Sequence, residues 1–187
     1  MKTFFFVTVF FLFTAFNVSA QHTQFGIKGG INIAGIDVED GNDLDSKVAA
    51  HIGVLAHIHV TRHFAVQPEL VFSMQGGEEG NLKAKQNFIN IPVLLQYMTG
   101  RGFRLQTGPQ LGFLVSAENE IGDVEYDVKD QLNTIDLSWS FGASYITVSG
   151  FGVDARYNHG LTNTNEAEQP EAKQRVWQLG VFYQFRR

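Results

Sequence analysis

The chain has 187 residues, a formal net charge of −5 and no cysteine. The length suits a single domain, and the negative charge argues against a nucleic-acid partner, because phosphate backbones are bound through a surplus of lysine and arginine. The lack of cysteine excludes disulfide bonds, thiol catalysis and thiolate metal sites.

Residues 1–20 predict a secretory signal peptide. Lys2 supplies the positive start, Phe4–Phe16 is an apolar run, and Val18–Ala20 is a cleavage site of small residues. The apolar run ends before it reaches the length of a membrane-spanning helix, about 20 residues. We therefore expect the mature chain to be a single domain over residues 21–187.

After the signal peptide, apolar and polar residues alternate, which is the period of β-strands. In chain order, the predicted strands are Gln24–Ile36, Val48–Val60, Phe64–Gln75, Asn87–Met98, Gly102–Ser116, Thr134–Ile146, Phe151–His159 and Arg175–Phe185. Each strand has one face of large apolar residues and one face of small or polar residues. An even number of such strands predicts an all-β fold, an eight-stranded antiparallel up-and-down transmembrane β-barrel in the outer membrane of a Gram-negative bacterium.

The connections predict the orientation of the barrel. Tight turns near 61–62, 99–102 and 147–150 alternate with long polar segments at 37–47, 76–86, 117–133 and 160–174. In such barrels the long loops face outward and the short turns face the periplasm. The long loops contain most of the acidic residues: Asp37, Glu39, Asp40, Asp43, Asp45, Glu118, Glu120, Asp123, Glu125, Asp127, Asp130, Glu166, Glu168 and Glu171.

Aromatic residues gather at the strand ends beside the short turns, where membrane barrels have a girdle of aromatic side chains. The predicted periplasmic girdle comprises Phe25, Phe64, Tyr97, Phe103, Tyr145, Phe151, Tyr183 and Phe185. Trp177 and Tyr157 are expected nearer the outer end of the barrel.

The mid-strand charges distinguish this barrel from a soluble, lipocalin-like barrel, which would have apolar residues inside. Here the charges share a face with Gly, Ser, Asn and Gln, whereas Lys or Arg on the apolar face would cost roughly 2–4 kcal/mol at the bilayer midplane. A lumen of eight strands is filled by side chains, and buried charges must be paired. We therefore predict a lumen ion-pair network and no large channel; its members are Lys28, Glu69, Arg104, Asp154 and Arg156.

Several short motifs resemble the outer-membrane β-barrel domain of the PorT-like ("porin family") proteins. They are Phe25–Asn32, Gln67–Leu70, Ile91–Leu95 and Gly108–Pro109. Their order and spacing are specific, and the resemblance covers essentially the whole mature chain. The resemblance implies an outer-membrane barrel of the Bacteroidetes type. The family's named member is linked to protein secretion, but most relatives have no assigned role, so that role is not transferred. Each strand proline removes a hydrogen-bond donor and predicts a bulge or a local break.

The sequence assigns no catalytic residue, no metal ligand and no cofactor. His51, His57, His59 and His63 share strand parity, and Asp37–Asp45 is acidic enough to suggest Ca²⁺, but lumen residues and a solvated loop are the favoured interpretations. The favoured function is a non-enzymatic structural or interaction role. The alternative is an outer-membrane enzyme, a lipid acyltransferase or a protease, for which only Ser116, Asp136 and His159 lie near one rim.

The expected partners follow from the fold. They are outer-membrane lipid, the barrel insertion machinery during assembly, and an unknown extracellular or envelope protein. The alternation from Trp177 to Phe185 in the last strand resembles the C-terminal signal that the insertion machinery reads, although two arginines follow it.

Overall fold

The computed structural model describes residues 23–38, 44–79, 82–121, 124–129, 132–163 and 172–185. The predicted signal peptide lies outside the described residues. The strands are β1 (Thr23–Val38), β2 (Leu44–His59), β3 (Phe64–Glu79), β4 (Leu82–Met98), β5 (Phe103–Ile121), β6 (Val124–Asp127), β7 (Ile135–Ile146), β8 (Phe151–Gly160) and β9 (Ala172–Gln184). No helix among these residues is long and apolar enough to cross a membrane.

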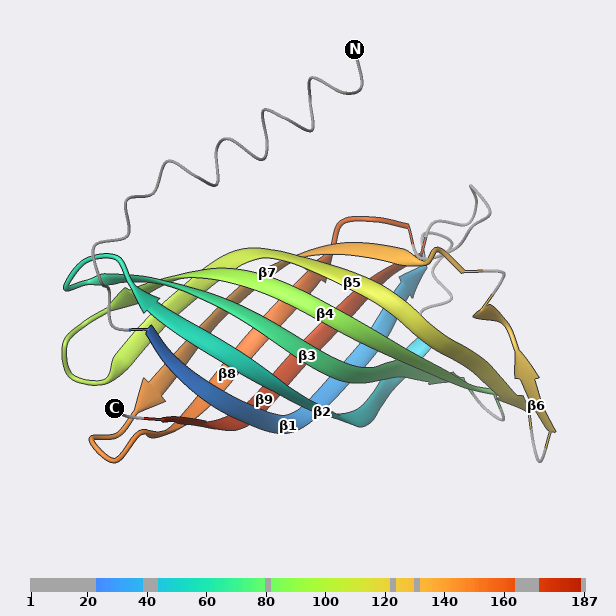
Figure 1. Cartoon of the computed structure of the whole chain (residues 1–187). Helices are drawn as coiled ribbons and strands as arrows, with labels where there is room; N and C mark the ends of the chain where they lie inside the picture. Colours follow the sequence, from blue (N-terminus) through green and yellow to red (C-terminus); the bar gives the residue numbers. More distant parts are fainter. Residues whose placement is uncertain are drawn as a thin grey trace, which may run out of the picture.

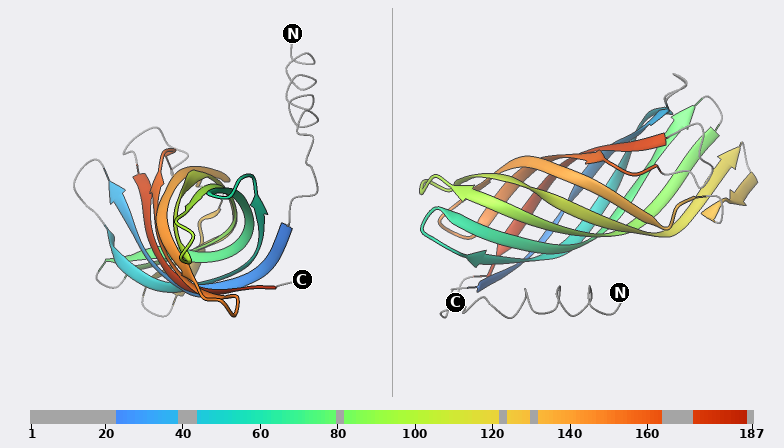
Figure 2. Two further views of the ribbon diagram at one scale, coloured as in Figure 1. Left: turned by 90° about the vertical axis from the view of Figure 1, so that its left-hand side faces the viewer. Right: turned by 90° about the horizontal axis from the view of Figure 1, so that it is seen from above.

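The strands close into an antiparallel barrel. Each strand pairs with its neighbours in the order β4-β3-β2-β1-β9-β8-β7-β5, and a further pairing of β4 with β5 completes the ring. Figure 1 shows the strands wrapping obliquely around the barrel, and the end-on view in Figure 2 shows them as a ring. The predicted eight-stranded antiparallel barrel is therefore confirmed. The ninth strand, β6, was not predicted; it pairs only with the far end of β5 and lies beyond the ring.

Three tight turns lie at the same end as the start of β1 and the end of β9 (Figure 1). Gly100, Gly102 and Gly150 have φ angles of 81°, 88° and 94°, which a residue with a side chain rarely adopts. At the opposite end the strands run further than predicted, with β3 paired to β4 as far as Glu79 and Leu82. In this extension Gly76, Gly77 and Ala84 are buried but have no polar side chain, so the alternation of apolar and polar residues that predicts a strand is lost although pairing continues.

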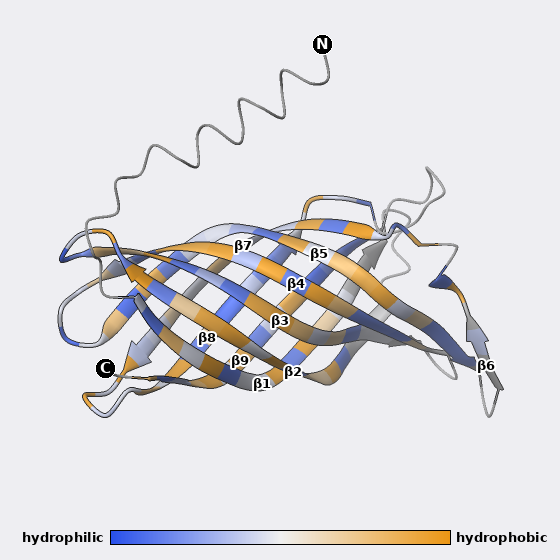
Figure 3. Ribbon diagram, in the orientation of Figure 1, coloured by the Kyte–Doolittle hydropathy of each residue, from blue (hydrophilic) through white to orange (hydrophobic). Residues whose placement is uncertain are grey.

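The two faces of the wall differ in chemistry, as Figure 3 shows in the alternating colours along each strand. Outward-pointing residues such as Ile52, Trp177 and Phe25 are exposed, whereas Asn32 and Gln184 on the lumen side are fully buried. An apolar outer face over a polar interior suits a barrel surrounded by lipid and is the reverse of a soluble barrel.

The strand prolines interrupt the hydrogen-bond ladders without shifting the register. Paired residues are missing around Pro68 between β2 and β3, around Pro92 between β3 and β4, and around Pro109 between β4 and β5. The strand register is the same on both sides of each gap. The register shifts lie elsewhere, at Ala34/Ile36, Ser46/His51 and Asn87/Phe88. These prolines therefore mark local breaks in the hydrogen-bond ladders rather than bulges.

The lumen is not uniformly polar, because apolar side chains also fill it. Near the outer end, Phe88, Leu114 and Ala117 form a buried cluster against which Val128 and Leu132 pack. Lower down, Gly152 faces Phe182, and a methyl group added at the glycine would overlap the phenyl ring. The absence of a side chain at Gly152 thus makes room for a large neighbour in a narrow interior.

Candidate functional site

A charged layer crosses the lumen. The Arg156 guanidinium on β8 donates two hydrogen bonds to the Glu69 carboxylate on β3, at 2.9 and 3.0 Å. Three strands separate β3 from β8 in either direction around the ring, so the two strands stand opposite each other. This fork-to-fork ion pair therefore spans the full width of the barrel.

Lys28 on β1 lies between these opposed strands. Its Nζ is 3.3 Å from Glu69 Oε2 and 3.3 Å from Asp154 Oδ2, and Asp154 is 3.8 Å from Arg156. The four side chains are at most 4% exposed, and their two positive and two negative charges cancel. Such compensation allows four ionised groups to be buried together.

Arg104 lies apart from the other charged residues predicted with it. Its Nη2 donates to Gln184 Oε1 at 3.1 Å, and among the described residues it forms no ion pair. In the ladder it stands opposite Met98 and Ser144, close to the start of β5. The sequence predicted Arg104 as a member of the same network because it shares the lumen-facing parity, but barrel strands are tilted and staggered, so shared parity does not give equal heights in the lumen.

Uncharged side chains cross the lumen as well. Gln174 on β9 donates to Gln86 on β4 at 2.6 Å, and these two strands are also opposite in the ring. Asn32 contacts His51, Ser73 and Gln178 through hydrogen bonds of 2.8, 2.9 and 3.1 Å. Sequence parity had put Asn32, His51, Ser73 and Gln178 on the lumen face, but which of them meet could not be read from parity. Gln86 and Gln174 fall in segments predicted as outer loops, so their contact inside the barrel was not predicted.

The aromatic residues predicted for the girdle are all exposed on the outer wall beside the short turns. The register places Phe64 opposite Tyr97, and Phe103 opposite Tyr145, while Phe151 stands opposite Tyr183. Two neighbouring pairs contact through their rings. The ring centroids of Phe64 and Tyr97 are 5.4 Å apart, and those of Tyr183 and Phe185 are 5.5 Å apart. Phe25 is joined to Phe185 by a backbone hydrogen bond of 2.8 Å. The ring centroids of Tyr157 and Trp177 are 4.8 Å apart.

Among the described residues, the candidate metal and catalytic groups do not assemble. No cluster of three potential ligands for a metal occurs in the described part of the chain, although the His57 and His59 rings are 4.5 Å apart. Most of the acidic segment 37–45 lies outside the described residues. Asp136 faces the lumen and accepts a hydrogen bond from Thr162 (3.1 Å), whereas His159 is exposed on the outer wall.

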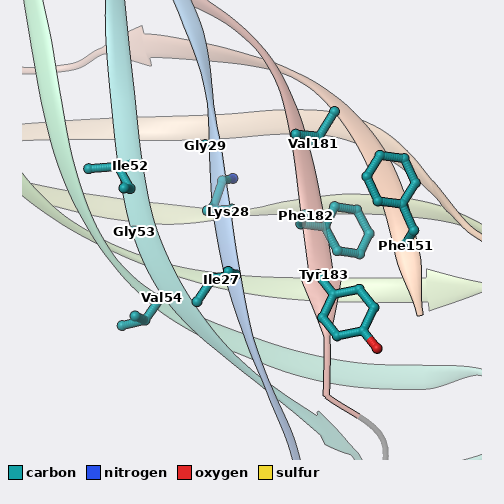
Figure 4. A pocket seen from close by; sticks show the side chains of 10 residues that line it. All are labelled: Ile27, Lys28, Gly29, Ile52, Gly53, Val54, Phe151, Val181, Phe182 and Tyr183. Atoms are coloured by element: carbon teal, nitrogen blue, oxygen red, sulfur yellow. The ribbon is translucent and has the colours of Figure 1, made fainter. Parts of the chain in front are cut away.

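A shallow pocket of about 450 Å³ lies against the outer wall over β1, β2, β8 and β9 (Figure 4). Gly29 leaves a gap there between its ladder partners Ile52 and Val181. Ile27 and Tyr183 are among the apolar residues around it. The pocket belongs to the exposed apolar surface, and Lys28 is the member of the charged layer that lines it.

A closed eight-stranded barrel with an apolar outer face and a packed polar lumen defines the class of small transmembrane β-barrels. Residues 19–166 match the family described as "outer membrane protein beta-barrel domain". The chain belongs to this family, and the protein is located in the outer membrane of a Gram-negative bacterium.

Solved structures share the fold at low sequence identity. Neisserial surface protein A is 15% identical with a TM-score of 0.62, over 88% of this chain and all (100%) of the other. Ail, the attachment invasion locus protein of Yersinia pestis, is 13% identical with a TM-score of 0.57, over 88% and 99%. A second structure of Ail, in complex with the heparin analogue sucrose octasulfate, has a TM-score of 0.55 at 15% identity, over 88% and 99%. A search of curated proteins found no match.

Proposed function

We propose that this protein is a non-conducting, non-enzymatic outer-membrane barrel that acts through its outer segments, in a structural or interaction role. The observation that carries the proposal is the Arg156–Glu69 pair across the full width of the lumen. The Gln174–Gln86 contact repeats the crossing nearer the outer end. A lumen crossed at two levels by buried side chains leaves no continuous path for ions.

The non-enzymatic part of the proposal rests on the separation of the candidate catalytic groups. A serine hydrolase needs a base and its orienting carboxylate in hydrogen-bond contact. Here Asp136 points into the lumen and His159 points outward, on opposite sides of the barrel wall. Ser116 instead accepts a hydrogen bond from Asn87 at 2.8 Å.

The charge of the outer segments bears on the chemistry of a partner. Most of the acidic residues of the chain lie in the segments that join the strands at the outer end. One solved structure of Ail contains a sulfated, polyanionic heparin analogue. Clustered carboxylates repel such a ligand, so we propose for this chain a neutral or cationic extracellular or envelope protein.

The finer assignments are part of the same proposal. The motifs quoted above support a PorT-like barrel of the Bacteroidetes type, and residues 1–20 support export through a cleaved signal peptide. The exposed apolar wall supports direct contact with outer-membrane lipid. The alternating last strand supports recognition by the barrel insertion machinery.

Reconstitution in planar bilayers tests the proposal. We expect no steady channel from the purified, folded protein, with a known porin in the same bilayer as the positive control. A stable conductance of porin size from protein that is folded, judged by its faster migration on unheated SDS gels, would contradict a closed lumen. Activity against lipid or peptide substrates that is lost in His159→Ala would contradict the non-enzymatic role.

A further inference from the structure

Arg104 is a buried cation without a buried anion. The residue is 6% exposed inside the barrel, and in the described part of the chain it belongs to no ion pair. One terminal nitrogen, Nη2, donates to Gln184 Oε1, while the other, Nη1, is buried and has no hydrogen-bond partner among the described residues. A guanidinium keeps its charge under all ordinary conditions, so neutralisation by proton loss is not available to it.

The amide groups beside Arg104 present further donors. Gln184 uses its oxygen to accept from Arg104, and Gln106 uses its oxygen to accept from Gln96 at 2.9 Å. Because each oxygen is engaged, the NH₂ group is the remaining end of each amide, and Nε2 of both Gln106 and Gln184 is buried without a partner. The hydrogen bond from Arg104 thus orients the Gln184 amide with its NH₂ group unsatisfied, and in the Gln96–Gln106 pair the Gln106 NH₂ group and the Gln96 oxygen are both left without partners.

Two more groups complete the surroundings. Ser144 stands directly opposite Arg104 in the ladder between β5 and β7, and its buried hydroxyl has no partner. His57 is buried within electrostatic range of Arg104 and lies beside the side chains of Gln67 and Gln96. Either form of a neutral imidazole carries one N–H that can donate.

We propose that Arg104 Nη1, the NH₂ groups of Gln106 and Gln184, and the Ser144 hydroxyl form a binding site for a small monovalent inorganic anion of the chloride class. Buried polar groups are normally satisfied, and a group of unsatisfied donors around an uncompensated cation matches the requirements of an anion. The site lies in the periplasmic half of the lumen, near the start of β5 and the end of β9.

The neighbouring charged layer determines the charge of the ligand. Ser144 is also opposite Asp154 in the ladder between β7 and β8, so a carboxylate lies one strand away from the site. Lys28 and Arg156 already compensate that carboxylate. A divalent anion such as phosphate would be repelled by Asp154 and would outweigh the single charge of Arg104, whereas one negative charge matches it.

The experiment measures urea unfolding of the folded protein in detergent while chloride replaces gluconate at constant ionic strength. Urea is used because guanidinium chloride brings its own chloride. We expect the equilibrium constant for unfolding to fall with chloride, approaching tenfold for each tenfold increase above the dissociation constant. Arg104→Gln should abolish this dependence, and Arg62→Gln, at an exposed arginine in a periplasmic turn, should retain it.

A second measurement keeps the proposal falsifiable if Arg104→Gln does not fold. Crystals of the parent protein grown in bromide should give an anomalous peak in contact with Arg104 Nη1. The proposal is overturned if the parent shows no chloride dependence, if Arg104→Gln shows the same dependence as the parent, or if the anomalous map has no peak there. A bromide peak with no effect of chloride on stability likewise counts against it, because it shows binding at crystal concentration only.

Discussion

Replacing Glu69 by alanine removes the anion that joins opposite sides of the barrel. The carboxylate accepts two hydrogen bonds from Arg156 and one from Gln67 at 2.7 Å, and it lies 3.3 Å from Lys28. After the substitution, Asp154 alone faces two buried cations. We therefore expect the barrel wall to form with correct pairing but with an uncompensated positive charge in its lumen.

The size of the effect follows from the burial of the group. Breaking a buried ion pair by removing one partner costs roughly 3–5 kcal/mol, because the remaining charge stays desolvated. The Glu69 side chain is fully buried (0% exposed), so screening by water does not reduce this figure. The equilibrium constant for folding should therefore decrease by a factor of roughly 10² to 10⁴.

Urea titration with tryptophan fluorescence measures this loss, since Trp139 and Trp177 are both exposed on the lipid-facing wall. The control is Glu118→Ala, at an exposed position of β5, which should change the free energy of unfolding by less than about 0.5 kcal/mol. A Glu69→Ala protein as stable as the parent would refute the reasoning. In a double-mutant cycle, Glu69→Ala combined with Arg156→Ala should cost less than the sum of the single changes.

Three further predictions concern packing, lipid contact and closure. Gly152→Ala should lower the free energy of unfolding by about 1–3 kcal/mol in urea, since its methyl group would overlap Phe182; unchanged stability would contradict this packing. Leu179→Arg, on the lipid-facing wall, should cost roughly 2–4 kcal/mol, whereas a variant as stable as the parent would imply that Leu179 does not meet lipid. Deleting residues 183–187 removes the hydrogen bonds of Gln184 to Gly150 and of Phe185 to Phe25, so the heat-modifiable band on SDS gels should disappear; its persistence would contradict the need for this closure.

The faces of the strands could be predicted from the sequence alone. Lys28, Glu69 and Arg156 share the parity of small polar residues, and the structure has all three inside the barrel. Alternation carries this information because side chains of a strand point to opposite faces in turn. For the same reason, the apolar outer wall and the class of barrel followed from the pattern of residues.

Which lumen residues meet was decided only by the tertiary structure. Arg156 contacts Glu69, and Gln174 contacts Gln86, because closure puts β8 opposite β3 and β9 opposite β4. Arg104, with the same parity, pairs with Gln184 instead. The pairing depends on the number of strands and their stagger around the ring, and these are properties of the closed barrel rather than of any one strand.

The extra strand β6 and the longer outer ends of β3, β4 and β5 were also beyond the reach of the sequence. Tyr126 within β6 is exposed, and Lys85 on β4 pairs with Glu120 on β5 at 2.7 Å in a partly exposed position. There, alternation no longer distinguishes an apolar from a polar face. The sequence therefore determined the part of the protein that has lipid on one side and the lumen on the other. Backbone pairing beyond that part, and contacts across the lumen, were fixed only when the chain closed into a ring.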